Sequence, residues 1–222
     1  MKPTTALPLL FTIVLMALAG CRPAPAGPTN APADDTSAAP PEAGNGLAVV
    51  SLYAYSGPYV EDGSGEPCEN VAAAVIQNDS DRAYEYAVVT VQTEHDTYRF
   101  QASTLLPGTV MTVLEAEKKP FQAAKQSSVT VETAAEFAAP PTVHLDTLAI
   151  SYADGVLNVK NLSKETLRNV TVGYKNEDET GFFGGITYRA KAGDVAPGQT
   201  VQIPAPHIRK DSSAVVFADY ES

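Results

Sequence analysis

Alternation of apolar and polar residues is the sequence feature that most constrains the fold of this chain. Segments 147–152, 129–132 and 169–174 show it most clearly: in 169–174, for example, Val170, Val172 and Tyr174 alternate with smaller or polar residues. Successive side chains of a β-strand point to opposite faces of the sheet, so a period of two predicts strands with one apolar face. From Leu47 onwards the period is two rather than the 3.6 of a helix.

Turn-forming residues separate these strands. Gly, Pro, Asn and Asp recur about every 8 to 12 residues, which is typical of a β-sandwich or a barrel. Asp154-Gly155 lies between two alternating runs and predicts a tight hairpin. We therefore expect an all-β fold.

Two short motifs occur twice in the same order. The triplets 78–80 (Asn-Asp-Ser) and 161–163 (Asn-Leu-Ser) begin 83 positions apart, and Pro107-Gly108 and Pro197-Gly198 lie 90 positions apart. Asparagine and serine side chains bond turn backbone, and Pro-Gly suits a tight turn, so each motif has a local structural reason. The second copy carries seven extra residues between these landmarks, which we place in a hairpin around 176–185.

The repeat predicts two tandem small immunoglobulin-like antiparallel β-sandwich domains. The first spans 47–139 and the second 142–222, with Pro140-Pro141 as a short stiff joint. Each stretch is long enough for a modest hydrophobic core of its own.

The second copy resembles small immunoglobulin-like modules of bacterial surface lipoproteins, including the FxLYD-type domain. Over 157–203 a strand, the Asn-x-Ser turn, a Val-x-Val-x-Tyr strand, an acidic turn and Pro-Gly-x-Thr follow in order. In the first copy, a loop at 56–70 replaces the Asp-Gly hairpin and His95-Asp96 replaces the acidic turn. The resemblance implies a seven-stranded extracytoplasmic module with no shared catalytic residues.

The N-terminal segment predicts export. Lys2 precedes an apolar stretch of 13 residues, 6–18, which is shorter than the roughly 20 residues of a membrane-spanning helix. Leu18-Ala19-Gly20-Cys21 resembles the lipobox of bacterial lipoproteins. The resemblance implies removal of a signal peptide, 1–20, diacylglycerol on the Cys21 thiol and often a further acyl chain such as palmitate. The alternative is an ordinary secretory signal.

Lipid on Cys21 would hold the protein on the membrane, because two or three acyl chains bury enough methylene groups for stable anchoring. Residues 21–46 are rich in Pro and Ala and predict a disordered tether. Cleavage before Cys21 leaves 14 Lys and Arg against 26 Asp and Glu, a net charge of −12. We therefore expect an extracytoplasmic, lipid-anchored protein that does not bind nucleic acid.

Residues capable of chemistry are scattered. His95, His144 and His207 are not at metal-ligand spacing, and no phosphate-binding loop or nucleophile elbow occurs. The acidic runs 61–66 and 177–179 lack the EF-hand pattern, so solvated turns are preferred to a calcium site. We expect no cofactor, no metal and no catalysis, although a triad assembled by folding stays an alternative.

Three aromatic residues are candidate partner contacts: Tyr59, Phe182 and Phe183. Adjacent strand residues point to opposite faces, so one Phe ring could be exposed. The alternative is a glycine-permitted bulge with both rings inward. Cys68 is the only thiol besides Cys21, and it either cross-links two molecules or is a small, partly buried residue.

Three functions are consistent with these features. We favour a non-catalytic binding or assembly module for a protein or an envelope polymer, displayed on a lipid tether. The first alternative is a solute-binding or carbohydrate-binding accessory lipoprotein that uses aromatic residues around Tyr59 or Phe182. The second alternative is a small hydrolase with a dispersed site.

Overall fold

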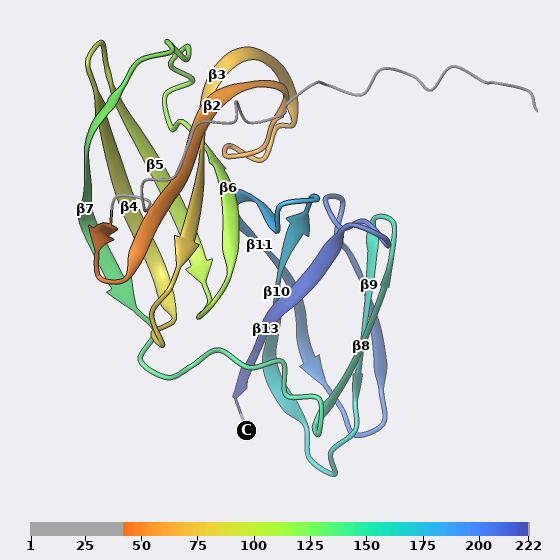
Figure 1. The fold of residues 1–222 in the computed structure, drawn as a ribbon. Coiled ribbons are helices and arrows are strands. Elements are labelled where there is room, and N and C mark those ends of the chain that lie inside the picture. Colours follow the sequence, from red (N-terminus) through yellow and green to blue (C-terminus); the bar gives the residue numbers. More distant parts are fainter. Residues whose placement is uncertain (1–41, 222) are drawn as a thin grey trace, which may run out of the picture.

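The computed structural model describes residues 42–221, and in this range every regular element is a strand (Figure 1). The prediction of an all-β fold is confirmed. The strands are β1 (Glu42–Gly44), β2 (Leu47–Tyr59), β3 (Glu66–Asn78), β4 (Tyr84–Thr93), β5 (Thr97–Leu105), β6 (Val110–Leu114), β7 (Gln126–Glu136), β8 (Leu148–Ala153), β9 (Val156–Asn161), β10 (Leu167–Glu177), β11 (Phe182–Val195), β12 (Thr200–Pro204) and β13 (Ser213–Glu221).

These strands form three sheets. One sheet has seven strands in the order β1-β2-β3-β6-β11-β10-β13, and two sheets have three strands each, β5-β4-β7 and β12-β9-β8. The pairing is antiparallel everywhere except between β6 and β11, where it is parallel. We call β1–β7 the first half of the molecule and β8–β13 the second half.

The two halves repeat one pairing pattern. In the first half β2-β3-β6 accompanies β5-β4-β7, and in the second half β8-β9-β12 accompanies β11-β10-β13. The second half thus has six strands within 148–221, one fewer than the FxLYD-type resemblance implies, and the seventh strand of the first half is the short β1.

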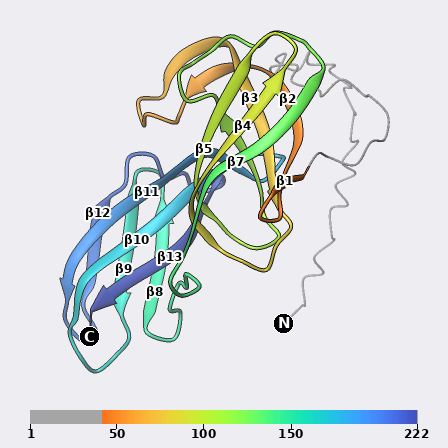
Figure 2. The same cartoon turned by 90° about the vertical axis from the view of Figure 1, so that its left-hand side faces the viewer.

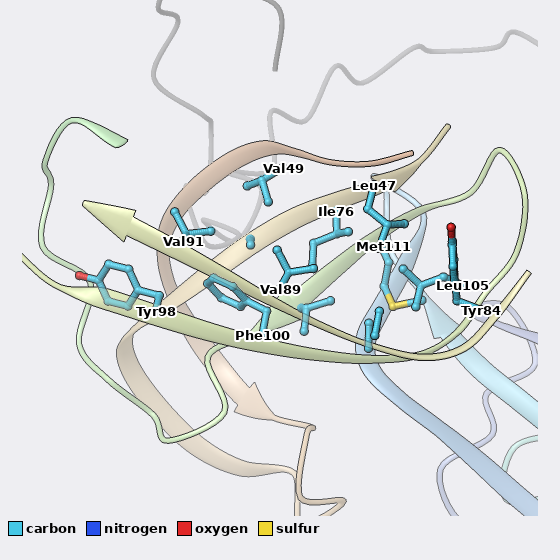
Figure 3. Close-up of a cluster of buried hydrophobic side chains, with 14 of the residues drawn as sticks. Leu47, Val49, Ile76, Tyr84, Val89, Val91, Tyr98, Phe100, Leu105 and Met111 are labelled. Atoms are coloured by element: carbon cyan, nitrogen blue, oxygen red, sulfur yellow. The ribbon is translucent and has the colours of Figure 1, made fainter. Parts of the chain in front are cut away.

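The first half buries its apolar residues between its two layers (Figure 3). Val49 and Ile76 come from the seven-stranded sheet, and Val89, Tyr98 and Phe100 come from the sheet opposite. Each of these side chains is at most 1% exposed. Full burial of one such side chain contributes about 1.5–3 kcal/mol, so this cluster accounts for much of the stability of the first half.

The second half has its own buried cluster. Leu157 and Val159 on β9 face Val170, Val172 and Tyr174 on β10, and all five are at most 2% exposed. The alternating residues of 169–174 thus lie on one buried face of a strand, as their spacing predicts.

A continuous sheet joins the halves, which the sequence did not predict. β11 pairs with β6 through Phe182 opposite Met111 and Phe183 opposite Thr112. The end of the β2–β3 hairpin also curls towards the second half (Figures 1 and 2). The contact between the halves is therefore much larger than the expected Pro140-Pro141 joint.

The described chain begins earlier than the predicted first domain. β1 pairs with β2 through Glu42 opposite Ala48 and Gly44 opposite Leu47, so residues 42–44 belong to the sheet and 45–46 form its turn. The signal peptide 1–20, Cys21 and the tether up to residue 41 lie outside the described residues. Within 42–221 no helix is long and apolar enough to cross a membrane.

Candidate functional site

The junction between the halves is the most distinctive site of the molecule, and it depends on Gly185. A Cβ atom at this position would lie 1.9 Å from the backbone oxygen of Gln101 on β5, so no side chain fits there. The Ser103 hydroxyl donates to the Gly185 carbonyl at 2.8 Å and lies 2.9 Å from the Thr187 hydroxyl oxygen. The glycine therefore allows β11 to approach β5 directly.

Phe182 and Phe183 lie on opposite faces at this junction. Phe182 packs against the buried cluster of the first half, and Phe183 packs against a small cluster that includes Tyr55, whose ring centroid is 5.5 Å away. Both rings are partly buried. The structure places these two residues against the first half of their own chain, and contact with an external partner stays a prediction.

Tyr59, the third predicted contact, is 2% exposed. Its hydroxyl donates to the backbone oxygens of Glu115 at 3.0 Å and Ala116 at 3.2 Å. Burial raises the pKa of the Tyr59 hydroxyl above its ordinary range. The ammonium group of Lys118 lies over the Tyr59 ring, 4.2 Å from its centroid. Tyr59 therefore offers almost no free surface to a ligand.

Glu61 links the hairpin end to both halves. Its carboxylate accepts the backbone N–H of Leu114 at 2.7 Å and that of Gly185 at 2.8 Å. Burial raises the pKa of the Glu61 carboxyl, and these backbone N–H groups and Lys175 oppose the rise. Leu114 belongs to the first half and Gly185 to the second, so one side chain holds the two together.

Lys175 is fully buried beside Glu61. Its ammonium group donates to the backbone oxygen of Ile186 at 2.9 Å and lies 3.7 Å from the Met111 sulfur. Burial lowers the pKa of Lys175 to about 7, and the charge of Glu61 opposes this shift. Sequence reasoning missed Lys175, because a lysine that follows an alternating strand resembles a solvated end.

A pocket of about 290 Å³ opens at the junction, and we call it the junction pocket. Tyr86, Gln101 and Ser103 form one wall, and Asp62 and Lys118 are exposed at the rim. The remaining lining consists of Tyr59, Glu61, Leu114, Ala116, Gly185 and Ile186. The pocket thus takes residues from both halves.

A wider hollow of about 570 Å³ lies between the hairpin end and the loop 206–212. His207 stacks on Tyr188 in its wall, with ring centroids 4.4 Å apart, and Phe183 also lines it. Tyr188 is only 9% exposed, so its ring mainly packs within the protein.

Neither models of known protein families nor curated protein sequences match this chain. The function is therefore argued from the geometry of the junction.

The other residues singled out from the sequence lie apart from each other. His95 is exposed at a turn, and His144 packs edge-on against Tyr220 at 5.0 Å. Within the described range no three His, Cys, Asp or Glu side chains are placed to hold a metal ion. Cys68 is a free, partly buried thiol beside Tyr55 and Tyr59.

In the two acidic runs, 61–66 and 177–179, aspartate side chains stabilise turns. Asp62 accepts the backbone N–H of Ser64 at 2.9 Å and pairs with Lys118 at 3.1 Å. Its hydrogen bonds with Ser64 and Lys118 lower the pKa of the Asp62 carboxyl to about 2. Asp178 likewise accepts the backbone N–H of Thr180 at 2.7 Å.

Proposed function

We propose that this protein is a lipid-anchored extracytoplasmic lipoprotein that acts as a non-catalytic binding or assembly module for a protein or an envelope component. The observation that carries the proposal is the junction, where one sheet, Glu61 and Lys175 join the halves. A rigid joint keeps surface residues of both halves in fixed relative positions. Fixed positions lower the ordering cost of binding a partner across both halves.

The anchor follows from the resemblance of Leu18-Ala19-Gly20-Cys21 to a lipobox. The predicted net charge of −12 for the mature chain would keep the folded part away from anionic headgroups and nucleic acid. Lipid on Cys21 would therefore supply the membrane affinity.

The anchor is tested by replacing the lipid-bearing residue. In Cys21→Ser cells we expect the protein to leave the membrane fraction, because without the acyl chains the acidic domain has no membrane affinity. Immunoblots of fractionated cells measure this release. Full retention of the Cys21→Ser protein in the membrane fraction would contradict the anchor.

The binding role is tested by photo-cross-linking in intact cells. A diazirine amino acid at position 86 probes the junction, and the same residue at Ser151, which is exposed on β8, is the matched control. We expect a discrete adduct from position 86 and none from position 151. Equal adducts from both positions, or none from position 86, would refute a binding role for the junction.

A second candidate function is favoured by one specific observation. The junction pocket lies between the halves and includes Tyr59, which the sequence suggested as part of a solute-binding or carbohydrate-binding site. A concave site with a few polar groups where two units meet is where small ligands usually bind.

A further inference from the structure

The lining of the junction pocket combines apolar and polar groups. The Tyr86 ring and Ile186 supply apolar surface, and Gln101 and Ser103 supply an amide and a hydroxyl. A sugar ring matches this combination, because its C–H face is apolar and its edge carries hydroxyl groups. The negative face of an aromatic ring attracts such polarised hydrogens.

Two polar side chains in the wall have unused hydrogen-bonding capacity. Within the part of the chain that the structure describes, neither the Tyr86 hydroxyl nor the Gln101 amide bonds another residue, and both side chains are partly exposed. The Ser103 hydroxyl donates to Gly185 but can still accept a hydrogen bond. A ligand with several hydroxyl groups could pair with all three.

Charge in the pocket is compensated internally. Asp62 is paired with Lys118 at 3.1 Å, and the Glu61 carboxylate accepts the backbone N–H groups of Leu114 and Gly185. An anionic ligand would meet two carboxylates, and a cationic ligand would compete with Lys118. The pocket therefore suits a neutral ligand.

From these observations we infer that the junction pocket binds a neutral, polyhydroxylated ligand, a single sugar residue or the end of a glycan, stacked on Tyr86 and hydrogen-bonded to Gln101. The volume of about 290 Å³ lies at the lower end of the range for ligand pockets, which fits one ring. This inference rests on the second candidate function and names its ligand class. It also assigns the stacking role to Tyr86 instead of Tyr59, whose hydroxyl is hydrogen-bonded to the backbone of Glu115.

The inference is tested by NMR titration of the mature chain carrying Cys21→Ser. The neutral probes are methyl glucoside, methyl galactoside and the methyl glycoside of N-acetylglucosamine, and the charged controls are gluconate and glucosamine. We expect at least one neutral glycoside to shift the amide signals of Gln101 and Gly185 saturably, with the charged controls much weaker.

Two variants locate the binding site. Tyr86→Ala should weaken the affinity for the glycoside about tenfold, because it removes the stacking face. Tyr220→Ala, which changes a partly buried tyrosine on β13, should leave the affinity unchanged. Dispersed amide spectra of both variants verify that they fold.

Three results would overturn the inference: no shifts with any neutral glycoside, charged controls that bind as well, or full affinity in Tyr86→Ala. If glycosides do not bind while the cross-link from position 86 persists, the sugar site is rejected and the binding role of the junction stands. Loss of both rejects both.

Discussion

At the residue scale, each copy of the sequence repeat contains one buried asparagine, and its hydrogen bonds give the repeat a structural reason. Asn78 and Asn161 are both fully buried, and each side chain bonds the backbone of its own turn and of a neighbouring strand. In both copies the backbone carbonyl of this asparagine also accepts a hydrogen bond from the backbone N–H of the glycine in the Pro-Gly motif. The donors are Gly108 at 2.9 Å and Gly198 at 3.0 Å. The Asn-x-Ser and Pro-Gly motifs therefore occur together in each copy because their two turns are in contact in the fold.

The side chain of Asn161 can be tested directly. Asn161→Ala should destabilise the protein by roughly 2–4 kcal/mol, because it leaves the buried carbonyl of Val195 without its donor. Asn158→Ala on the same strand removes one weak exposed bond to Gln202 and should change stability by less than about 0.5 kcal/mol. Urea unfolding measures both, and equal losses would contradict the proposed role of Asn161.

Lys175 predicts a pH dependence of stability. Its pKa falls from 10.5 to about 7 on folding, so between these pH values the unfolded chain binds more protons than the folded one. Stability should therefore rise with pH above about 7, with a slope of at most about 1.4 kcal/mol per pH unit. Below that pH both states are protonated and this contribution is constant.

Urea unfolding between pH 7 and 9 checks this prediction at pH values below the ordinary pKa of tyrosine, about 10. Lys175→Met should lose the rise, and Lys191→Met, which changes an exposed lysine on β11, should keep it. A wild-type stability that is flat over this range, or an unchanged slope in Lys175→Met, would show that Lys175 stays charged in the fold.

At the scale of elements, the alternation of apolar and polar residues predicted where strands lie but not which strands pair. Val170, Val172 and Tyr174 were placed on one face from their spacing, but no period in the sequence indicates that β11 pairs with β6. Beside that pairing, Gly185 lets β11 approach β5, and glycine only permits a close approach without specifying which strand approaches. β1 was missed although Asn45-Gly46, with φ values of 55° and 71°, is a strong hairpin signal.

Gly185 tests the junction at the same scale. Gly185→Val should push β11 away from β5 and destabilise the protein by at least about 3 kcal/mol, because the new side chain meets backbone that cannot move independently. Gly193→Ala is the control: its site is open, and its φ of +70° alone should cost about 1 kcal/mol. Thermal unfolding compares them, and similar losses would mean that β5 and β11 separate readily.

At the scale of the whole molecule, the sequence predicted two units on a stiff joint. The structure adds a shared sheet, the partly buried Glu61 and the fully buried Lys175. Of the predicted contact residues, Tyr59 and Phe183 do come together near the junction, but as packing groups. The junction pocket could not be predicted, because Gly185 and Ile186 close it over Tyr86, Gln101 and Ser103 only once the two halves dock.

Residual dipolar couplings of the mature chain carrying Cys21→Ser test the rigid junction most directly. Backbone N–H couplings from 47–136 and from 148–221 each yield an alignment tensor. We expect the two tensors to agree in orientation and magnitude, because one sheet passes through both halves. Tensors that differ in magnitude would show that the halves move independently, and the proposed composite binding site would then not exist.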